Sequence, residues 1–297
     1  MGPAMKAGII GLGAMGLPMA RNLHRAGLLE GAWNRTASKA AALAAETGCR
    51  AFASPAELAA ACPFVVTCIS ADEDLLAVVD ALRPTLKKGS IVMDCSTVAA
   101  DTARAAARRI AEVGSSFLDC PVSGGVEGAK QATLAIMCGG DAAAFERAQP
   151  VLAALGKTIV LMGPSGSGQA TKATNQILCA GAIQAAAEAM AFAQAEGLPL
   201  ERVIDVLGKG AGSSWYFVHR APFMARGEYP AGFRVRLHEK DLRICREMAA
   251  RHGAKLPVVE ATLADYARLT ADGHAEEDIS TVFRLKAPLF SGGGADG

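Results

Sequence analysis

The sequence predicts an α/β Rossmann-type doubly wound sheet domain followed by an all-α C-terminal domain. Short apolar runs alternate with helical patterns as far as Gly163, a glycine-rich turn follows the first of these runs, and strand patterns cease after a Gly/Ser/Pro stretch at 163–168. Alternating strands and helices are typical of a parallel sheet covered on both faces. Because only part of the 297-residue chain shows this alternation, a doubly wound sheet is favoured over a barrel.

The expected strands are short apolar runs, and the expected helices carry apolar residues at helical spacing. The strands are Ala7–Ile10, Leu29–Trp33, Phe64–Ile69, Ile91–Asp94, Ser116–Asp119, Leu134–Cys138 and Thr158–Met162. The helices include Met15–Ala26, Ala40–Glu46, Asp74–Leu82 and Thr102–Val113. Ser54 before Pro55 is typical of a helix N-cap followed by a first-turn proline, and Asp141 is expected to cap a later helix.

The second half of the chain is expected to be helical. Gln169–Glu196 is rich in alanine and predicts one long helix, and helical periodicity continues to about Leu285. We therefore expect a sheet domain at 1–163 and an all-α domain at 164–290 that begins with a long interdomain helix. The glycine-rich segment 291–297 is expected to be a flexible tail.

Composition excludes several classes of partner. Hydrophobic residues make up 51% of the chain and the formal net charge is +1, so neither nucleic acid nor an anionic membrane is expected as a partner. No apolar run approaches the roughly 20 residues that span a bilayer, and the N-terminus lacks the apolar core of a signal peptide. We expect a cytoplasmic protein.

Cysteine and histidine usage points to neither disulfides nor metal. The eight cysteines contain no Cys-x-x-Cys pair and several lie inside apolar runs, so reduced, buried thiols are expected. The five histidines show no metal-ligand spacing.

The glycine-rich turn predicts a dinucleotide site. It reads G-x-G-x-x-G between a strand and a helix and consists of Gly11, Leu12, Gly13, Ala14, Met15 and Gly16. Its first glycine permits the tight turn, its second lets a phosphate approach the backbone, and its third lets helix and strand pack closely. The helix N-terminus then offers unpaired N–H groups to a pyrophosphate. This pattern indicates a nicotinamide dinucleotide and an oxidoreductase.

The end of the second strand favours NADP over NAD. An acidic residue there would bind the ribose 2′-hydroxyl of NAD, but the sequence has Asn34, followed by Arg35 and Thr36. A guanidinium and a hydroxyl suit a 2′-phosphate, and no carboxylate repels it. Alternatively, Arg35 is a solvated loop residue, which leaves the missing acid without an explanation.

Four ordered segments resemble the β-hydroxyacid dehydrogenases, a family that includes 3-hydroxyisobutyrate dehydrogenase, tartronate semialdehyde reductase and the glyoxylate/succinic semialdehyde reductases. The segments are Gly8–Gly27, Asp119–Gly125, Gly163–Gln176 and His238–Leu242, and they span nearly the whole chain. The resemblance implies a homodimer or homotetramer that acts on a small carboxylate-bearing aldehyde or hydroxy acid. The domain at 1–163 would then bind NADP, and the all-α domain at 164–290 would serve substrate binding and oligomerisation.

The residues of the third segment suit a proton transfer. Lys172 can supply the proton to a carbonyl that is being reduced if burial or a nearby cation lowers its pKa. Asn175, three residues later on the same helix face, can hold the substrate hydroxyl or orient the ammonium. The alternative for Lys172 is a surface cation. Ser123, Gly124 and Gly125 offer a hydroxyl and bare N–H groups to a carboxylate, or form a plain turn.

Further roles come from the resemblance alone. It places Ile69, Ser70, Thr97 and Lys240 near the cofactor, and Ser96, Trp215, Phe233 and Asp241 near the substrate. Ile69–Ser70 departs from the Leu-Pro that members often have, and Cys120 stands where members often have alanine. Trp215 could equally be a core residue. Adjacent helical residues do not face each other, so no ion pair is expected between Lys240 and Asp241.

We therefore expect an NADP-dependent oxidoreductase that interconverts a small β-hydroxy acid and its semialdehyde. An imine reductase shares this architecture but usually carries Asp or Tyr where Lys172 stands. A non-catalytic dinucleotide-binding interaction module is the third possibility, and such proteins typically lose this lysine. The sequence does not choose among glyoxylate, succinic semialdehyde, tartronate semialdehyde, 3-hydroxyisobutyrate, 3-hydroxypropionate and serine.

Overall fold

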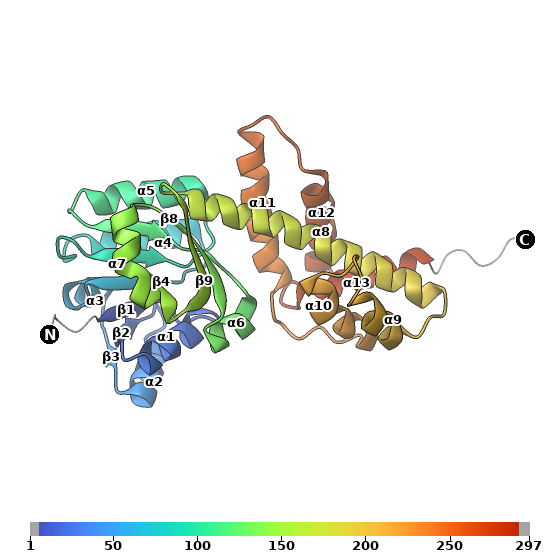
Figure 1. Cartoon of the computed structure of the whole chain (residues 1–297), viewed down its shortest axis with the longest axis horizontal. Helices are drawn as coiled ribbons and strands as arrows, with labels where there is room; N and C mark the ends of the chain where they lie inside the picture. Colours follow the sequence, from blue (N-terminus) through green and yellow to red (C-terminus); the bar gives the residue numbers. More distant parts are fainter. Residues whose placement is uncertain (1–5, 291–297) are drawn as a thin grey trace, which may run out of the picture. The chain divides into compact units, whose positions relative to one another are not determined.

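A computed structural model of the chain describes residues 6–290 (Figure 1). The chain divides into two compact units, of which the first ends at Lys172 and the second begins at Ala173. This division falls inside helix α8 (Ser167–Ala195), whereas the sequence suggested a boundary after residue 163. The expected tail at 291–297 lies outside the described residues.

The first unit is built on one sheet of nine strands in the order β3-β2-β1-β4-β5-β6-β8-β7, with β9 beside β8. The strands are β1 (Ala7–Ile10), β2 (Leu29–Trp33), β3 (Arg50–Ala51), β4 (Phe64–Thr67), β5 (Ile91–Asp94), β6 (Ser116–Asp119), β7 (Val122–Ser123), β8 (Leu134–Gly139) and β9 (Gly156–Gly163). Four of the predicted strands have the bounds that the sequence indicated. The two-residue strands β3 and β7 were missed because they are too short to show a period.

The sheet is not parallel throughout, which corrects the sequence-based expectation. The six neighbouring strands β3, β2, β1, β4, β5 and β6 run parallel, but β8 is antiparallel to both β6 and β7. Only residues 124–133 separate β7 from β8, and a parallel crossover needs a dozen residues or more. The short connection therefore reverses the chain.

Helices cover both faces of the sheet, as Figure 1 shows. The helices of this unit are α1 (Gly16–Arg25), α2 (Ala37–Thr47), α3 (Pro55–Ala61), α4 (Asp72–Leu82), α5 (Ala100–Ala111), α6 (Gly125–Gln131) and α7 (Ala142–Ala153). Alternate residues of β5 belong to two separate cores: Met93 packs with residues of α1, α2 and α7, and Val92 packs with residues of α3, α4 and α5. This two-sided burial is typical of a doubly wound sheet.

The helix caps expected from the sequence are confirmed. The Ser54 side chain accepts a hydrogen bond from the Glu57 amide in the first turn of α3, and Pro55 occupies the first helical position. The Asp141 carboxylate accepts from the Ala144 amide at the start of α7. Each cap satisfies a backbone donor that the helix leaves unpaired.

The second unit is helical, as predicted. It contains most of α8, α9 (Leu200–Leu207), α10 (Trp215–Arg226), α11 (Val235–Ala250), α12 (Pro257–Ala271), α13 (Phe283–Lys286) and the 3₁₀ helices η1 (Ile279–Val282) and η2 (Ala287–Phe290). Its core surrounds the fully buried Tyr266, with Met190 from α8 and Leu242 from α11.

Helix α8 is long and apolar enough to cross a membrane by length and composition, with a mean hydropathy of 1.3 over its most apolar window. This finding differs from the expectation that no apolar run approaches the length that spans a bilayer. Half of that window is buried inside the protein, as is typical of a core helix. The helix combines apolar burial with the polar side chains of Lys172, Asn175 and Gln176.

All eight cysteines are free thiols, and six of them are buried. Several lie in or beside the sheet, where their sulfur atoms fill core volume as small hydrophobic groups. Between residues 6 and 290, no group of three or more His, Cys, Asp or Glu side chains is arranged to hold a metal ion.

A buried ion pair connects α10 to the segment before η1. The Nε atom of Arg220 lies 3.3 Å from Oδ1 of Asp278, with 6% and 0% of the two side chains exposed. Asp278 also accepts from the Phe233 amide at 2.9 Å and from the Ser280 hydroxyl at 2.8 Å. Removing one member of such a pair leaves an uncompensated charge inside the protein.

We predict that Asp278→Ala lowers the free energy of unfolding by about 3–5 kcal/mol, because Arg220 would remain buried without its counter-ion. Urea denaturation at neutral pH measures the change. The control is Glu228→Ala, which removes the exposed Arg226–Glu228 pair and should cost less than about 1 kcal/mol. Equal losses of unfolding free energy in the two variants would show that the buried pair contributes no more to stability than the exposed one.

Candidate active site

The glycine turn at the end of β1 has the geometry that a dinucleotide site needs. Gly11 has φ +95°, and a Cβ there would lie 2.2 Å from the carbonyl oxygen of Cys68. A Cβ on Gly16 would lie 1.9 Å from the carbonyl oxygen of Gly11. A Cβ on Gly13 would meet nothing within 4 Å. Gly11 and Gly16 are therefore needed for close packing, and Gly13 leaves its backbone open to a phosphate group.

Asn34 ties the end of β2 to this turn. Its Oδ1 accepts from the Leu12 amide at 2.8 Å, and its Nδ2 donates to the carbonyl of Thr36 at 3.0 Å. A carboxylate at this position could accept the first bond but could not donate the second, which gives a structural reason for the amide. Arg35 is exposed and forms an ion pair with Asp74 at 3.0 Å. Thr36 is also exposed.

A hydrogen-bond chain joins the carboxyl ends of β4 and β5. Asp94, the last residue of β5, accepts from the Thr67 hydroxyl at 2.6 Å and from the Ser96 hydroxyl at 2.5 Å. The Ser96 oxygen accepts in turn from the Ile69 amide at 2.8 Å. Ser96 is buried and its only hydroxyl proton points to Asp94, so the structure gives it a role in positioning Ile69. Ser70, the next residue, is exposed, and Thr97 is half-buried.

Burial raises the pKa of Asp94 to about 6, although the hydrogen bonds from Ser96 and Thr67 oppose this shift. Its Oδ2 is buried and has no hydrogen-bond partner among residues 6–290. An ionised carboxylate with one unsatisfied oxygen is costly in the core, so the neutral acid is favoured to a higher pH than usual.

A second buried carboxylate caps helix α8. Asp119, the last residue of β6, accepts from the Gly166 amide at 2.8 Å and from the Gln169 amide at 3.0 Å. Burial raises the pKa of Asp119 above its ordinary value, and these amide donors oppose the shift. A Cβ on Gly168 would lie 2.3 Å from the Met137 carbonyl oxygen, so the first turn of α8 packs directly against the sheet.

Gln169 makes a second connection between α8 and the sheet. Its side chain is nearly fully buried, its Nε2 donates to the Ser96 carbonyl at 2.8 Å, and its Oε1 accepts from the Val98 amide at 3.2 Å. The segment after β5 that contains Thr97 is therefore held against the start of α8.

Lys172 lies one turn further along α8 and is 8% exposed. Its Nζ donates to the carbonyl oxygen of Val122 at 2.9 Å. Val122 precedes the half-buried Ser123 on β7, and Gly124 and Gly125 follow with φ values of +132° and +63°. The structure thus brings the candidate proton donor to the candidate carboxylate receptor within the first unit, and Lys172 is not a surface cation.

The remaining candidate residues belong to the second unit. Asn175 Nδ2 donates to Gln176 Oε1 at 2.8 Å, and Gln176 Nε2 donates to Asp241 Oδ2 at 2.6 Å. Lys240 Nζ lies 3.0 Å from Asp241 Oδ1. The expectation that these neighbours would not pair is therefore wrong. Adjacent helix positions point apart, but the long, flexible lysine stem can bring its ammonium back to the next carboxylate.

The two aromatic candidates have different surroundings. Trp215 begins α10 and is 46% exposed, so it is not a core residue. Its ring stacks on His219 at a centroid distance of 4.3 Å, and the Arg220 guanidinium lies 5.0 Å from the ring. Phe233 is half-buried, with its ring 5.1 Å from that of His238.

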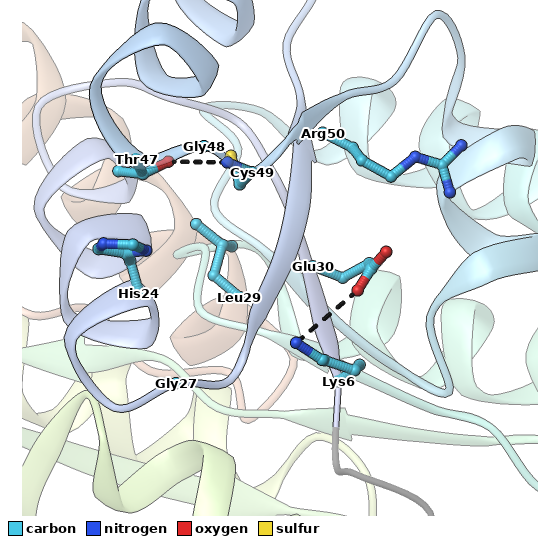
Figure 2. Close-up of a pocket in the computed structure, with 9 residues that line it drawn as sticks. All are labelled: Lys6, His24, Gly27, Leu29, Glu30, Thr47, Gly48, Cys49 and Arg50. Carbon is cyan, nitrogen blue, oxygen red and sulfur yellow. Dashed lines mark hydrogen bonds and ion pairs between the residues drawn. The ribbon is translucent and has the colours of Figure 1, made fainter.

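A cavity of about 340 Å³ is lined by the residues labelled in Figure 2. It lies at the amino ends of the strands, whereas the glycine turn follows the carboxyl end of β1. It lies where β1, β2 and β3 begin, and its lining contains the ion pair of Lys6 with Glu30 at 3.9 Å. None of the candidate site residues lines it. Ligands of open α/β sheets bind at the carboxyl ends of the strands, so this cavity is not the candidate active site.

Sequence reasoning gave no role to Asp94, Asp119, Gln169 or Gln176. A signal was present for the two acids, because each ends a buried apolar strand, where a charged residue is costly unless it is hydrogen-bonded. The two glutamines stand in a helical pattern among alanines, and only their tertiary contacts distinguish them.

Comparison with known proteins agrees with this geometry. Residues 6–163 match the NAD binding domain of 6-phosphogluconate dehydrogenase, and residues 166–286 match the NAD-binding family of NADP-dependent 3-hydroxyisobutyrate dehydrogenase. The NAD-dependent L-serine dehydrogenase of Pseudomonas aeruginosa is 35% identical over 94% of this chain and 97% of its own. The 2-hydroxy-3-oxopropionate reductase of Escherichia coli is 34% identical over 94% of this chain and 96% of its own.

Solved structures of related enzymes share the fold of this chain. A structure of 3-hydroxyisobutyrate dehydrogenase from Mycobacterium tuberculosis with L-serine matches with a TM-score of 0.86 and 32% identity, covering 95% of this chain and 99% of that one. The glycine turn and the doubly wound sheet define an oxidoreductase that uses a nicotinamide dinucleotide. The chain belongs to the β-hydroxyacid dehydrogenase family.

We predict that Asp94 makes the protein less stable as the pH rises from 4 to 7. Its pKa in the folded protein is about 6 and its ordinary value is 3.8, so the folded state binds more protons than the unfolded state in this range. The free energy of unfolding should therefore fall relative to that of Asp94→Asn, by up to about 3 kcal/mol. Urea denaturation of both proteins at pH 4, 5, 6 and 7 measures the difference, and parallel pH profiles would contradict the prediction.

Proposed function

We propose that this enzyme interconverts a small β-hydroxy acid and its semialdehyde with NADP as the cofactor. The observation that carries the proposal is the placement of Lys172, which is buried with its ammonium against the Val122 carbonyl beside Ser123. An ammonium next to a carboxylate receptor fits a substrate that has both a carboxylate and a carbonyl. A purely dinucleotide-binding module would have no need for it.

A bound nicotinamide would supply the hydride for reduction and accept it in oxidation, and the residues of the chain position the substrate carbon and move the proton. Lys172 donates a proton from Nζ to the carbonyl oxygen during reduction and takes it back during oxidation. The Ser123 hydroxyl and the backbone N–H groups of Gly124 and Gly125 bind the carboxylate. Asn175 accepts a hydrogen bond from the substrate hydroxyl or from the Lys172 ammonium.

The buried hydroxyl of Ser96 supports the proposed cofactor site at the ends of β4 and β5 by positioning Ile69. Its hydroxyl oxygen accepts a hydrogen bond directly from the Ile69 amide and its proton is donated to Asp94, at the strand ends where a nicotinamide would lie. Ile69, Ser70 and Thr97 are proposed as cofactor contacts on these strand ends, and Lys240 as a cofactor contact from the second unit. Trp215, Phe233 and Asp241 are proposed to contact the substrate.

The preference for NADP rests on the residues after β2. Asn34 is neutral and is engaged with the backbone, and the exposed Arg35 can exchange its ion pair with Asp74 for a 2′-phosphate. An exposed ion pair of this kind is worth little, so the exchange costs little. The similarity of residues 166–286 to an NADP-dependent family supports this preference.

A second copy of this chain is the proposed partner. Large apolar side chains are exposed on α8, α9, α10 and α12 of the second unit, and a self-complementary interface would remove them from water. They include Leu178, Phe192, Val206, Leu207, Val218 and Val258. Sedimentation equilibrium distinguishes a dimer or tetramer from a monomer, and a monomer at micromolar concentration would contradict the proposal.

We predict that Lys172→Ala lowers kcat by roughly 10²- to 10⁴-fold, because the carbonyl oxygen loses its proton donor. The affinity for NADPH, measured by fluorescence titration, should change little. The assay follows NADPH consumption across a panel of semialdehydes and glyoxylate. Lys157→Ala, which removes an exposed lysine of the same unit, is the control. Normal turnover in Lys172→Ala would rule out the proton-transfer role.

We predict that Arg35→Ala weakens NADPH binding by about 10- to 100-fold, the range expected for the loss of a charge-assisted hydrogen bond to phosphate. Binding of NADH, which lacks the 2′-phosphate, should change little. The matched control is Asp74→Ala, which releases Arg35 and should leave NADPH binding intact or tighter. An equal loss for both cofactors in Arg35→Ala would show that Arg35 does not select NADP.

A further inference from the structure

The side chain of Gln176 lies at the centre of a polar chain inside the second unit. It is 1% exposed, its Oε1 accepts from Asn175 Nδ2 at 2.8 Å, and its Nε2 donates to Asp241 Oδ2 at 2.6 Å. Asp241, itself 5% exposed, is paired through its other oxygen with the Lys240 ammonium. The two carboxamides therefore lie in series behind a single ion pair, in which the carboxylate is buried and the lysine is half-buried.

Only one polarity satisfies this chain. An ionised carboxylate accepts hydrogen bonds and cannot donate them, so the amide nitrogen of Gln176 must face Asp241. The carbonyl of Gln176 is then turned toward Asn175, which must present its own amide nitrogen in return. The Lys240 ammonium lies 3.0 Å from Oδ1 of Asp241, and the order of donors and acceptors along the chain begins at that ion pair.

Cys179 supports the same orientation of Asn175. Its Sγ lies 3.3 Å from Asn175 Nδ2 and 3.7 Å from Gln176 Oε1. The amide group of Asn175 thus has two acceptors, Gln176 Oε1 and Cys179 Sγ, on the same side. With Nδ2 turned to them, Oδ1 is the other arm of the planar carboxamide and points away from both acceptors.

We infer that Gln176 is a positioning residue: it transmits the polarity of the Lys240–Asp241 pair to Asn175 and fixes Oδ1 of Asn175 as a hydrogen-bond acceptor. This inference rests on the proposed function for the role of Asn175. The two groups that Asn175 is proposed to hold, a substrate hydroxyl and an ammonium, are both donors. A carboxamide that rotated freely would present its NH₂ group to them part of the time.

The chain contains a matched control for this arrangement. Gln184, two turns later on α8, donates from its Nε2 to Asp265 Oδ2 at 3.0 Å, and Asp265 pairs with Lys286 at 2.9 Å. This Gln–Asp–Lys chain has the same chemistry but does not involve a candidate catalytic residue. Loss of either glutamine removes one hydrogen bond between helices of the same unit.

The test compares Gln176→Met with Gln184→Met in steady-state kinetics on the best substrate of the panel. Methionine keeps the length of the side chain and removes both polar groups. We expect Gln176→Met to lower kcat at least about tenfold, while KM for NADPH changes less than about twofold. Gln184→Met should leave kcat unchanged. A normal kcat in Gln176→Met, or an equal loss in both variants, would overturn the positioning role.

A change of polarity gives an independent rescue. Gln176→Glu places two carboxylates face to face and should lose activity. Adding Asp241→Asn supplies an amide at position 241 that can donate to the new carboxylate at position 176, which in turn accepts from Asn175. The double variant should therefore recover at least about fivefold in kcat over Gln176→Glu, while loss of the substrate contact proposed for Asp241 is measured separately as KM for the substrate. A double variant that is no better than the single one would contradict the relay.

Neutron diffraction of the perdeuterated protein separates this inference from the proposed function. The two deuterons of Asn175 should be found on the side of Gln176, and those of Gln176 on the side of Asp241. If the wild-type enzyme turns over no member of the panel, the proposed function fails, yet the neutron map still decides the orientation. A map with Oδ1 of Asn175 facing Gln176 would refute the relay whatever the enzyme catalyses.

Discussion

The carboxylate of Asp119 determines where helix α8 begins. It lies at the carboxyl end of β6 with no exposed surface, and it accepts hydrogen bonds from the amides of Gly166 and Gln169. A buried carboxylate is costly alone, and a helix N-terminus has unpaired donors, so each group satisfies the other. Because Gly168 admits the backbone of the sheet without a side chain between them, the helix starts at a fixed position and in a fixed rotation.

The candidate chemistry follows from this starting point. Lys172 comes one turn after the capped end, so the rotation of the helix brings its ammonium to Val122 and the segment of Ser123. One further turn brings Asn175 and Gln176, whose amides belong to the chain of hydrogen bonds that ends at Asp241. A single helix thus carries the proposed proton donor and the residue proposed to orient the hydroxyl, and the capping carboxylate sets the register of both.

Sequence patterns predicted the parts of the fold that depend on local periodicity. Strands β1, β2, β5 and β6, the caps at Ser54 and Asp141 and the glycine turn were all found where the pattern placed them. The antiparallel direction of β8 was not predictable from its apolar run, since direction depends on the connection. In the site, the glycine turn indicated the binding of a phosphate group, and Lys172 indicated a proton transfer. The roles of Asp94, Ser96 and Gln176 arise from contacts between distant segments, which no local pattern records.

Isotope transfer from the cofactor tests the central claim, that this fold carries out hydride transfer to a carbonyl. The enzyme would be incubated with a semialdehyde and with NADPH deuterated at either face of nicotinamide C4, and the hydroxy acid analysed by mass spectrometry. Direct hydride transfer predicts one deuterium on the carbon that bears the new hydroxyl, from only one of the two labelled cofactors. A product without deuterium from either cofactor, formed at the normal rate, would contradict it.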